Sequence, residues 1–250
     1  MSQNVKEELI ETPGCSWVKL KKITWKDPQG KTRLWEAAYR PTRKGAVDAV
    51  LLVPILKKRG QPDKIVLVSQ FRPPVGKMCI ETPAGLVDAG ESYERAALRE
   101  LKEETGYFGK SHSARASPVV SADAGMSSAT CAYVHIEIDG DDPDNLNPVA
   151  APDEGEFIET HLVSLPDLLQ FLDNKAREGW MPEGKLYAYA LGLPRSQESN
   201  TEVQKQEDNK KDKLVSNEPH KSNMMLPFLV GMVLGVLGIR LVHSSPMCRK

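Results

Sequence analysis

Residues 85–107 limit the possible fold of this chain more than any other stretch. They read G-L-V-D-A-G-E-S-Y-E-R-A-A-L-R-E-L-K-E-E-T-G-Y. Gly85 and Gly90 permit a tight loop that other residues resist, and apolar residues then recur at helical spacing as far as Gly106. The pattern predicts a loop, a helix opened by Glu91 and a second loop.

The expected helix gathers carboxylates on one face. Glu100 and Glu104 stand four residues apart and share a face, with Glu103 on the adjoining turn. Each like-charge pair costs about 0.2–0.5 kcal/mol in an isolated helix, and carboxylate oxygens are ligands that suit Mg²⁺ or Mn²⁺. The alternative is an acidic face that only meets solvent. We expect a divalent cation to offset the repulsion, and Glu104 to lie exposed toward it.

Read as a pattern, the stretch is G-x5-E-x7-R-E-U-x-E-E-x-G-U, in which U is apolar. It resembles the Nudix box at every position, and composition alone would produce that match with odds of about one in a million. The resemblance implies an α/β fold, an α/β/α sandwich, that hydrolyses a nucleoside diphosphate linked to another group. It gives metal-ligand roles to Glu100 and Glu104, with Glu103 as a nearby catalytic helper.

Two more charged residues of the box have expected partners. Arg99, which the resemblance places in the catalytic centre, lies four residues before Glu103 and can pair with it. Glu91 can pair with Arg95 at the same spacing. We expect these pairs to brace the acidic cluster.

The N-terminal part reads as β structure after a short lead-in. Residues 1–14 are polar and acidic, and we expect them to be mobile. Runs at 17–26 and 31–40 flank the turn signal D-P-Q-G and predict a hairpin. Trp17 and Trp35 fall one in each run. They form either an exposed pair able to sandwich a purine base or two side chains packed on the core.

The remaining elements follow from short apolar runs and one amphipathic pattern. Residues 47–56, 65–68, 130–138 and 157–165 predict strands, and residues 166–178 and 185–191 predict helices. We expect residues 15–194 to form the Nudix domain, with 15–45 as its N-terminal β region.

Four further motifs narrow the resemblance. They are G-K-T-R-L-W-E, Q-F-R-P-P, I-E-T-P-A-G-L and G-E-F-I-E, and together they resemble the ADP-ribose and ADP-sugar pyrophosphatases over residues 17–193. The resemblance implies a homodimer built through the N-terminal hairpin. In it the adenine lies between Trp17 and Trp35, the latter contributed by the second subunit.

The same resemblance assigns the other contacts. Arg72 would engage the diphosphate, since a guanidinium binds two oxygens at once, and its alternative is a structural ion pair. The carbonyl of Ala84 would be a metal ligand. The further substrate contacts would be Glu36, Arg40, Leu86 and Asp123, the last reaching the terminal ribose across the dimer.

An acid late in the chain completes the expected site. Residues 140–154 form a long loop rich in Asp and Pro that could cover it. Glu156 matches the acid that joins the metals or activates water in related enzymes, and Glu154 is the alternative. The expected products are AMP and ribose 5-phosphate. Two other functions stay open: hydrolysis of oxidised nucleoside diphosphates, and binding of ADP-ribose without cleavage.

Charge and composition bear on partners and location. The formal net charge of −1 offers no basic field for nucleic acid. Four cysteines lack C-x-x-C spacing and no apolar signal region opens the chain, so we expect a catalytic domain in the reducing cytosol.

The C-terminal part departs from the domain in composition. Residues 195–223 are polar and charged and predict a disordered linker. Residues 224–242 are apolar apart from Arg240 and predict a single transmembrane helix, with Arg240 snorkelling to the headgroups. We expect this segment to be a tail anchor in the outer mitochondrial membrane or the endoplasmic reticulum.

Overall fold

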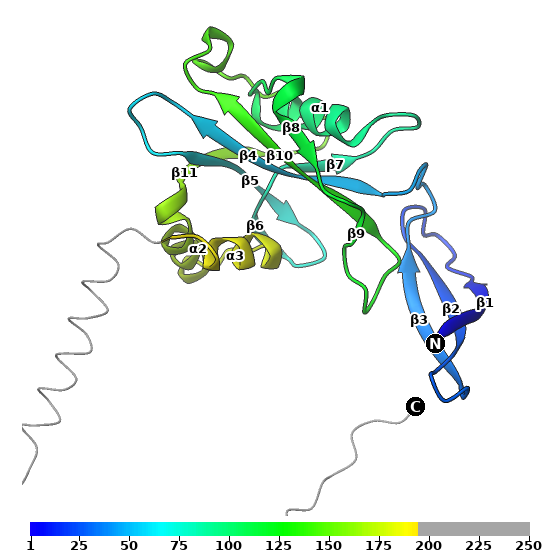
Figure 1. Cartoon of the computed structure of the whole chain (residues 1–250). Coiled ribbons are helices and arrows are strands. Elements are labelled where there is room, and N and C mark those ends of the chain that lie inside the picture. The colour runs from blue at the N-terminus through cyan, green and yellow to red at the C-terminus, as the bar shows by residue number, and fades with distance from the viewer. Residues whose placement is uncertain (195–250) are drawn as a thin grey trace, which may run out of the picture. The chain divides into compact units, whose positions relative to one another are not determined.

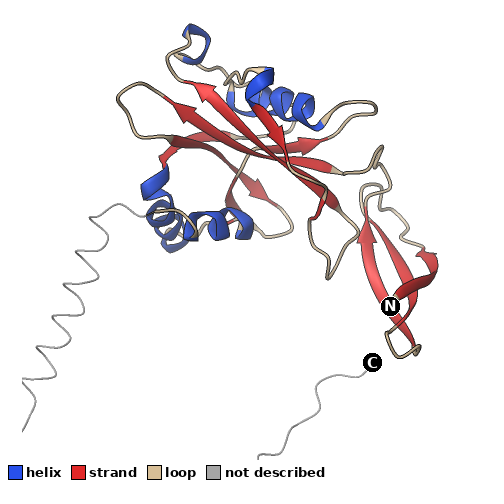
Figure 2. Ribbon diagram, viewed as in Figure 1, coloured by secondary structure: helices blue, strands red, loops and turns tan. Residues whose placement is uncertain are grey.

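The computed structural model describes residues 1–194, which form two β-sheets and several helices (Figures 1 and 2). The strands are β1 (Gln3–Ile10), β2 (Lys19–Lys26), β3 (Thr32–Tyr39), β4 (Ala49–Lys57), β5 (Lys64–Arg72), β6 (Lys77–Glu81), β7 (Ala84–Leu86), β8 (Ala114–Ala116), β9 (Val120–Ser121), β10 (Thr130–Asp139), β11 (Glu159–Ser164) and β12 (Met181–Pro182). The α-helices are α1 (Tyr93–Thr105), α2 (Leu168–Arg177) and α3 (Gly184–Leu191), and the short 3-10 helices are η1 (Ser111–Ser113), η2 (Pro143–Asn145) and η3 (Leu165–Asp167).

The larger sheet is mixed and lies between two helical layers. Its main path runs β12-β6-β5-β4-β10-β8, with β11 paired to β5, β7 to β4 and β9 to β10. The central pair β4 and β10 is parallel, whereas β4 and β5 are antiparallel. Figure 1 shows α1 on one face of this sheet and α2 and α3 on the other. The predicted α/β/α sandwich is therefore confirmed for the described residues.

Strand β4 carries apolar residues to both layers. Val50 and Leu52 pack in one core cluster with Leu101 of α1, and Ile55 packs in a second cluster with Leu168 of α2. All of these side chains are buried. Burial on both faces requires a continuous apolar run rather than an alternating one, which explains the sequence of residues 47–56.

Helix α1 has both of its ends fixed by the local sequence. The Ser92 hydroxyl accepts a hydrogen bond from the Arg95 backbone N–H at 3.3 Å, and Gly106 ends the helix with a φ of 77°. The expectation that Glu91 opens the helix is wrong by two residues, because Ser92 is the cap. Pro166 likewise lies in η3, so α2 begins at Leu168 rather than at 166.

The smaller sheet contains the expected hairpin and one unexpected strand. β2 and β3 pair antiparallel around the turn at residues 27–30, as predicted. The expectation that residues 1–14 are a mobile lead-in is wrong for residues 3–10, which form β1 along β2. Charge complementarity explains the pairing: Glu8 lies opposite Lys22, and Lys21 Nζ is 2.9 Å from Glu7 Oε2.

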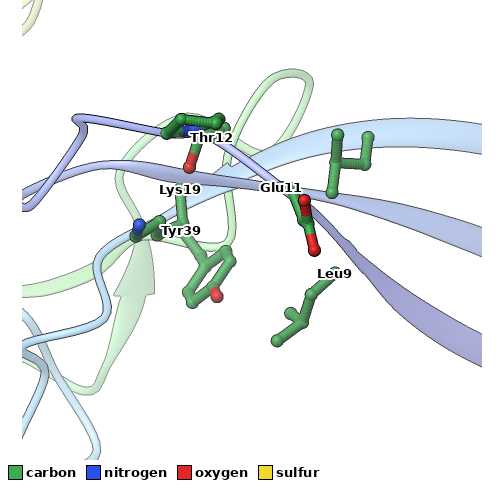
Figure 3. A pocket seen from close by; sticks show the side chains of 7 residues that line it. Leu9, Glu11, Thr12, Lys19 and Tyr39 are labelled. Carbon is green, nitrogen blue, oxygen red and sulfur yellow. The ribbon is translucent and has the colours of Figure 1, made fainter.

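A hollow of about 380 Å³ lies beside this smaller sheet (Figure 3). Leu9 and Tyr39 supply apolar walls, and Glu11, Thr12 and Lys19 supply polar ones. The hollow shares no lining residue with the cleft described below, as far as residues 1–194 are concerned.

The predicted linker (195–223) and apolar segment (224–242) lie outside the described residues. Within residues 1–194, no helix combines the length and hydrophobicity that crossing a membrane requires.

Candidate active site

A cleft of about 530 Å³ brings together residues from distant parts of the chain. Arg40 comes from the linker after β3, Arg72 from the end of β5, and three residues from α1. Eight predicted site residues line it: Arg40, Arg72, Ala84, Leu86, Arg99, Glu100, Glu103 and Glu156. The structure therefore brings these eight positions together in one cleft, and their roles stay predictions.

Glu104 lies beneath the cleft rather than at its surface. Its residue exposure is 4%, so the expectation of an exposed position is wrong. Its Oε2 accepts a hydrogen bond from the Ala84 backbone N–H at 3.1 Å. Burial raises the pKa of this carboxyl to about 8, and the nearby charges of Glu100 and Glu156 act in the same direction. The helix face was predicted correctly, but its depth below β7 was not.

Glu100 lies against the backbone of Gly85. A Cβ atom added to Gly85 would collide with the Glu100 carboxylate, so only glycine leaves room for that carboxylate. Burial also raises the pKa of Glu100. Glu100 and Glu104 therefore flank the Ala84–Gly85 peptide, one packed on it and one hydrogen-bonded to it.

Arg99 connects the loop before α1 to the acidic cluster. Its Nη1 lies 2.7 Å from Glu100 Oε1 and 3.1 Å from Glu103 Oε2, which confirms the predicted Glu103 pair. Its Nη2 donates to the Leu86 carbonyl at 3.0 Å and pairs with Glu91 at 3.0 Å. The predicted pair of Glu91 with Arg95 is wrong, because Glu91 precedes the helix and faces Arg99. This pairing lowers the pKa of Glu91.

Arg72 forms the ion pair that the sequence offered as its alternative role, and its contact with a diphosphate stays a prediction. It lines the cleft, and its Nε donates to Glu81 Oε2 at 2.9 Å. Its side chain is about half exposed, which leaves part of the guanidinium accessible to a ligand. The ion pair therefore orients the side chain at the rim of the cleft.

The loop between β10 and β11 delivers two acids to the cleft. Its backbone is attached to the end of α1, since Ala151 N–H donates to the Glu103 carbonyl at 2.8 Å. Asp153 and Glu156 line the cleft, whereas Glu154 lies outside its lining. Glu156 Oε2 accepts from the Asp153 backbone N–H at 3.3 Å, so the two acids share one tight turn.

Four predicted contacts lie outside this cleft: Trp17, Trp35, Glu36 and Asp123. Trp17 is in the bend before β2, not in a strand as expected. Trp17 and Trp35 are 69% and 52% exposed, so the alternative that both pack on the core of this chain is wrong. Trp35 Nε1 donates to the Gly125 carbonyl at 3.2 Å. The adenine sandwich across two subunits stays a prediction.

Apart from Gly85, which the sequence assigned to the loop, three lining residues were not predicted: Ala49, Asp88 and Asp153. Asp88 lies inside the box, between Gly85 and Gly90, at a position where the pattern fixes no residue type. Asp153 adjoins the two acids that were considered, and only the turn that it forms with Glu156 distinguishes it. Ala49 has an apolar side chain without a reactive group, so its type gives no signal in the sequence.

The cleft is rich in donors for a hard cation. No group of three or more His, Cys, Asp and Glu side chains within residues 1–194 is close enough to hold an ion as it stands. The carboxylates have other partners instead: Arg99 for Glu100 and Glu103, and Ala84 N–H for Glu104. Their oxygen chemistry nevertheless fits Mg²⁺ or Mn²⁺, since buried, mutually repelling carboxylates gain from a divalent cation.

Comparison with known proteins decides the family. A family model described as the NUDIX domain matches residues 46–184. The chain belongs to the Nudix family. Helix α1 with the loop before it is therefore the Nudix box of this domain, as the sequence pattern predicted.

Two curated relatives match most of this Nudix chain. It is 46% identical over 201 residues to the ADP-sugar pyrophosphatase of Mus musculus, covering 79% of this chain and 89% of the mouse protein. It is also 46% identical over 188 residues to the ADP-ribose pyrophosphatase of Saccharomyces cerevisiae, covering 73% and 79% respectively. A solved structure described as an ADP compounds hydrolase shares the fold, with a TM-score of 0.52, 23% identity and coverage of 70% and 87%.

Proposed function

We propose that this Nudix protein hydrolyses ADP-ribose and related ADP-sugars, giving AMP and ribose 5-phosphate from ADP-ribose. The observation that carries the proposal is the cleft, whose lining includes Glu100 and Glu103 of the acidic cluster together with Arg72 and Arg40. The two relatives named above are called pyrophosphatases of ADP-sugars and ADP-ribose and match over most of their length.

The charge of the cleft supports a role for a divalent cation. Its lining contains three arginines and five carboxylates, with Glu104 beneath them. An anionic diphosphate would be repelled there unless cations offset the surplus of negative charge. We propose that Glu100, Glu104, the Ala84 carbonyl and Glu156 hold Mg²⁺, with Mn²⁺ as a substitute. When bound, such an ion neutralises phosphate oxygens and acidifies water.

We assign separate roles in the reaction to two arginines and one glutamate of the cleft. Arg72, already oriented by Glu81, binds diphosphate oxygens, and Arg40 contacts the nucleotide. Glu156 accepts a proton from the attacking water. The water oxygen forms a new bond to one phosphorus, the bridging P–O bond breaks, and each product leaves with one phosphate.

Product analysis tests this proposal directly. The protein is incubated with Mg²⁺ and, in separate reactions, ADP-ribose, ADP-glucose and an oxidised guanosine diphosphate. We expect AMP and ribose 5-phosphate from ADP-ribose at the highest rate. Faster hydrolysis of the oxidised nucleotide would favour the sanitising function, and binding of ADP-ribose without any product would favour a sensor.

The role of Glu156 as the base can be tested with Glu156→Gln, and Glu154→Gln is the matched control. Glu156→Gln is expected to lower kcat more than it raises KM, because a base acts mainly in the transition state. Glu154→Gln is expected to keep both constants near the wild-type values. The reverse order would assign the base to Glu154.

We further propose that two copies of the chain form the complete site. Trp17, Trp35, Glu36 and Asp123 all lie outside the cleft of a single chain, and the two tryptophans are exposed. A second copy would bring these residues to the nucleotide. Sedimentation analysis is expected to give a dimer, and a monomer with full activity would overturn this arrangement.

We also propose that residues 224–242 attach the protein to an intracellular membrane, with the catalytic domain in the cytosol. The support is the apolar sequence, which approaches the roughly 17–25 residues that span a bilayer. Cell fractions containing the full chain are expected to resist alkaline carbonate extraction, whereas a chain ending at Asn223 is expected to be soluble. Extraction of the full chain would overturn the proposal.

A further inference from the structure

Arg43 lies in the linker between β3 and β4 and binds two separate segments of the chain. On its own segment it donates to the carbonyls of Gly45, at 3.2 Å, and Ala46, at 2.6 Å. On the other segment it donates to the Ser128 carbonyl at 3.3 Å and to the Thr130 hydroxyl. One guanidinium therefore joins residues 43–46 to residues 128–130.

Asp48 and Thr130 close the same cluster from the other side. Asp48 Oδ2 accepts from the Thr130 N–H at 2.9 Å and lies 3.7 Å from Arg43 Nε. The Asp48 N–H donates to the Thr130 carbonyl at 2.9 Å, and the Thr130 hydroxyl donates to the Ala46 carbonyl at 2.9 Å. Asp48 is buried, so its charge needs this partner. We call Arg43, Ala46, Asp48, Ser128 and Thr130 the Arg43 cluster.

The first segment of the Arg43 cluster leads into the cleft at two points. Arg40 lines the cleft, and its carbonyl accepts from the Arg43 N–H at 3.4 Å across one turn. Ala49, which follows Asp48, lines the cleft as well. The Asp48 carbonyl also accepts from the N–H of Val87, which lies in the box loop, at 3.3 Å.

The second segment leads to the smaller sheet. The loop at residues 122–129 accepts from Trp35 Nε1 through Gly125 and exchanges hydrogen bonds with Ala38 of β3 through Met126 and Ser128, both at 2.9 Å. This loop also contains Asp123, a predicted ribose contact. The Arg43 cluster is therefore the point where the cleft side of the domain is joined to the loop that contacts Trp35.

We propose that Arg43 is a positioning residue for the substrate. It fixes Arg40 and the 122–129 loop relative to the carboxylates of α1, and so controls nucleotide binding while lying outside the cleft lining itself. The inference rests on the proposed function, because Arg40 is assigned there to the nucleotide. A planar guanidinium has five N–H donors in a fixed fork. An ammonium at the same place cannot reach the same set of acceptors.

The test compares Arg43→Ala, Arg43→Lys and Thr130→Val with the wild-type full chain. Arg95→Ala is the matched control, since Arg95 is an exposed arginine on the outer side of α1. Initial rates are measured with ADP-ribose at saturating Mg²⁺, below the melting temperature of every variant. We expect both Arg43 variants to raise KM about tenfold while kcat stays within about threefold of the wild-type value. Thr130→Val is expected to raise KM as well, and Arg95→Ala is expected to change neither constant.

The outcomes separate the possible explanations. A KM within twofold of wild type in the Arg43 variants would overturn the inference. If kcat were also lower in those variants, the result would show that Arg43 only supports folding. If Arg43→Ala does not fold, Arg43→Lys and Thr130→Val decide by the same criterion. A wild-type chain that cleaves no ADP-ribose overturns the proposed function and the inference with it, whereas unchanged variants beside an active wild type overturn the inference alone.

Discussion

Glu104→Gln is expected to stabilise the metal-free protein while it removes activity. The side chain is buried, and its pKa rises from 4.5 to about 8 on folding because of burial and of the nearby charges of Glu100 and Glu156. A carboxyl whose folded pKa is raised holds its proton more tightly in the folded state. The free energy of unfolding therefore falls as pH rises from about 4.5 to about 8.

The size of the effect follows from the same shift. Each unit by which a pKa differs between the folded and unfolded chain corresponds to about 1.4 kcal/mol. At pH 8 the Glu104 carboxyl thus lowers the free energy of unfolding by at most about 5 kcal/mol. Relaxation of the site reduces this value, and we expect a gain of about 2–3 kcal/mol for Glu104→Gln at pH 8. The amide oxygen still accepts the Ala84 N–H, so that hydrogen bond is kept.

Urea unfolding in EDTA at pH 5 and pH 8 measures this difference, followed by tryptophan fluorescence. Glu103→Gln is the matched control, because it makes the same chemical change one residue away at the partly exposed rim. We expect the variants to have similar stability at pH 5, and only Glu104→Gln to gain at pH 8. Equal pH dependence in Glu104→Gln and wild type would refute the argument. Mg²⁺-dependent turnover of Glu104→Gln is expected to fall to near background.

Three other predictions test separate parts of the structure. Gly85→Ala is expected to lower turnover about a hundredfold without unfolding the chain, because the new methyl displaces the Glu100 carboxylate; activity and circular dichroism check this. Trp17→Ala and Trp35→Ala are each expected to raise KM for ADP-ribose about tenfold through lost base stacking, and unchanged KM with a lower melting temperature would contradict it. Burial lowers the pKa of His161, so protonation below pH 6.5 favours the unfolded chain; His161→Gln is expected to reduce the loss of stability between pH 7 and pH 5.

The α/β/α sandwich and the acidic cluster could be predicted because each depends on a pattern within one short stretch of sequence. Strand β4 is buried on both faces and reads as a continuous apolar run, and Glu100 and Glu104 fall four residues apart on one helix. Spacing along a helix fixes which residues share a face. It does not fix how far that face lies from solvent, which depends on β7 and the rest of the domain. Glu104 was therefore placed on the correct face and at the wrong depth.

Apart from element boundaries, the errors concern contacts that helical spacing does not describe. Glu91 pairs with Arg99 rather than Arg95 because it lies in the loop before α1, where helical spacing does not apply. β1 contains no alternating apolar pattern, and its position depends on lysines of β2. The Arg43 cluster joins residues more than 80 positions apart. Such pairs carry no periodic signal, so a single sequence cannot identify them.

The exposed side chains of the smaller sheet give a physical reason for the proposed dimer. Leu20, Leu34 and Trp35 all remain exposed on a three-stranded sheet, which is too small to bury them on itself. The same sheet holds Trp35 and Glu36, two of the predicted nucleotide contacts that the cleft of one chain lacks. Covering the sheet with a second copy would remove apolar surface from water and bring these contacts to a nucleotide. Burial of apolar surface and substrate binding would therefore favour the same dimer. In that dimer the Arg43 cluster would hold Arg40 in position relative to the residues that the second copy supplies.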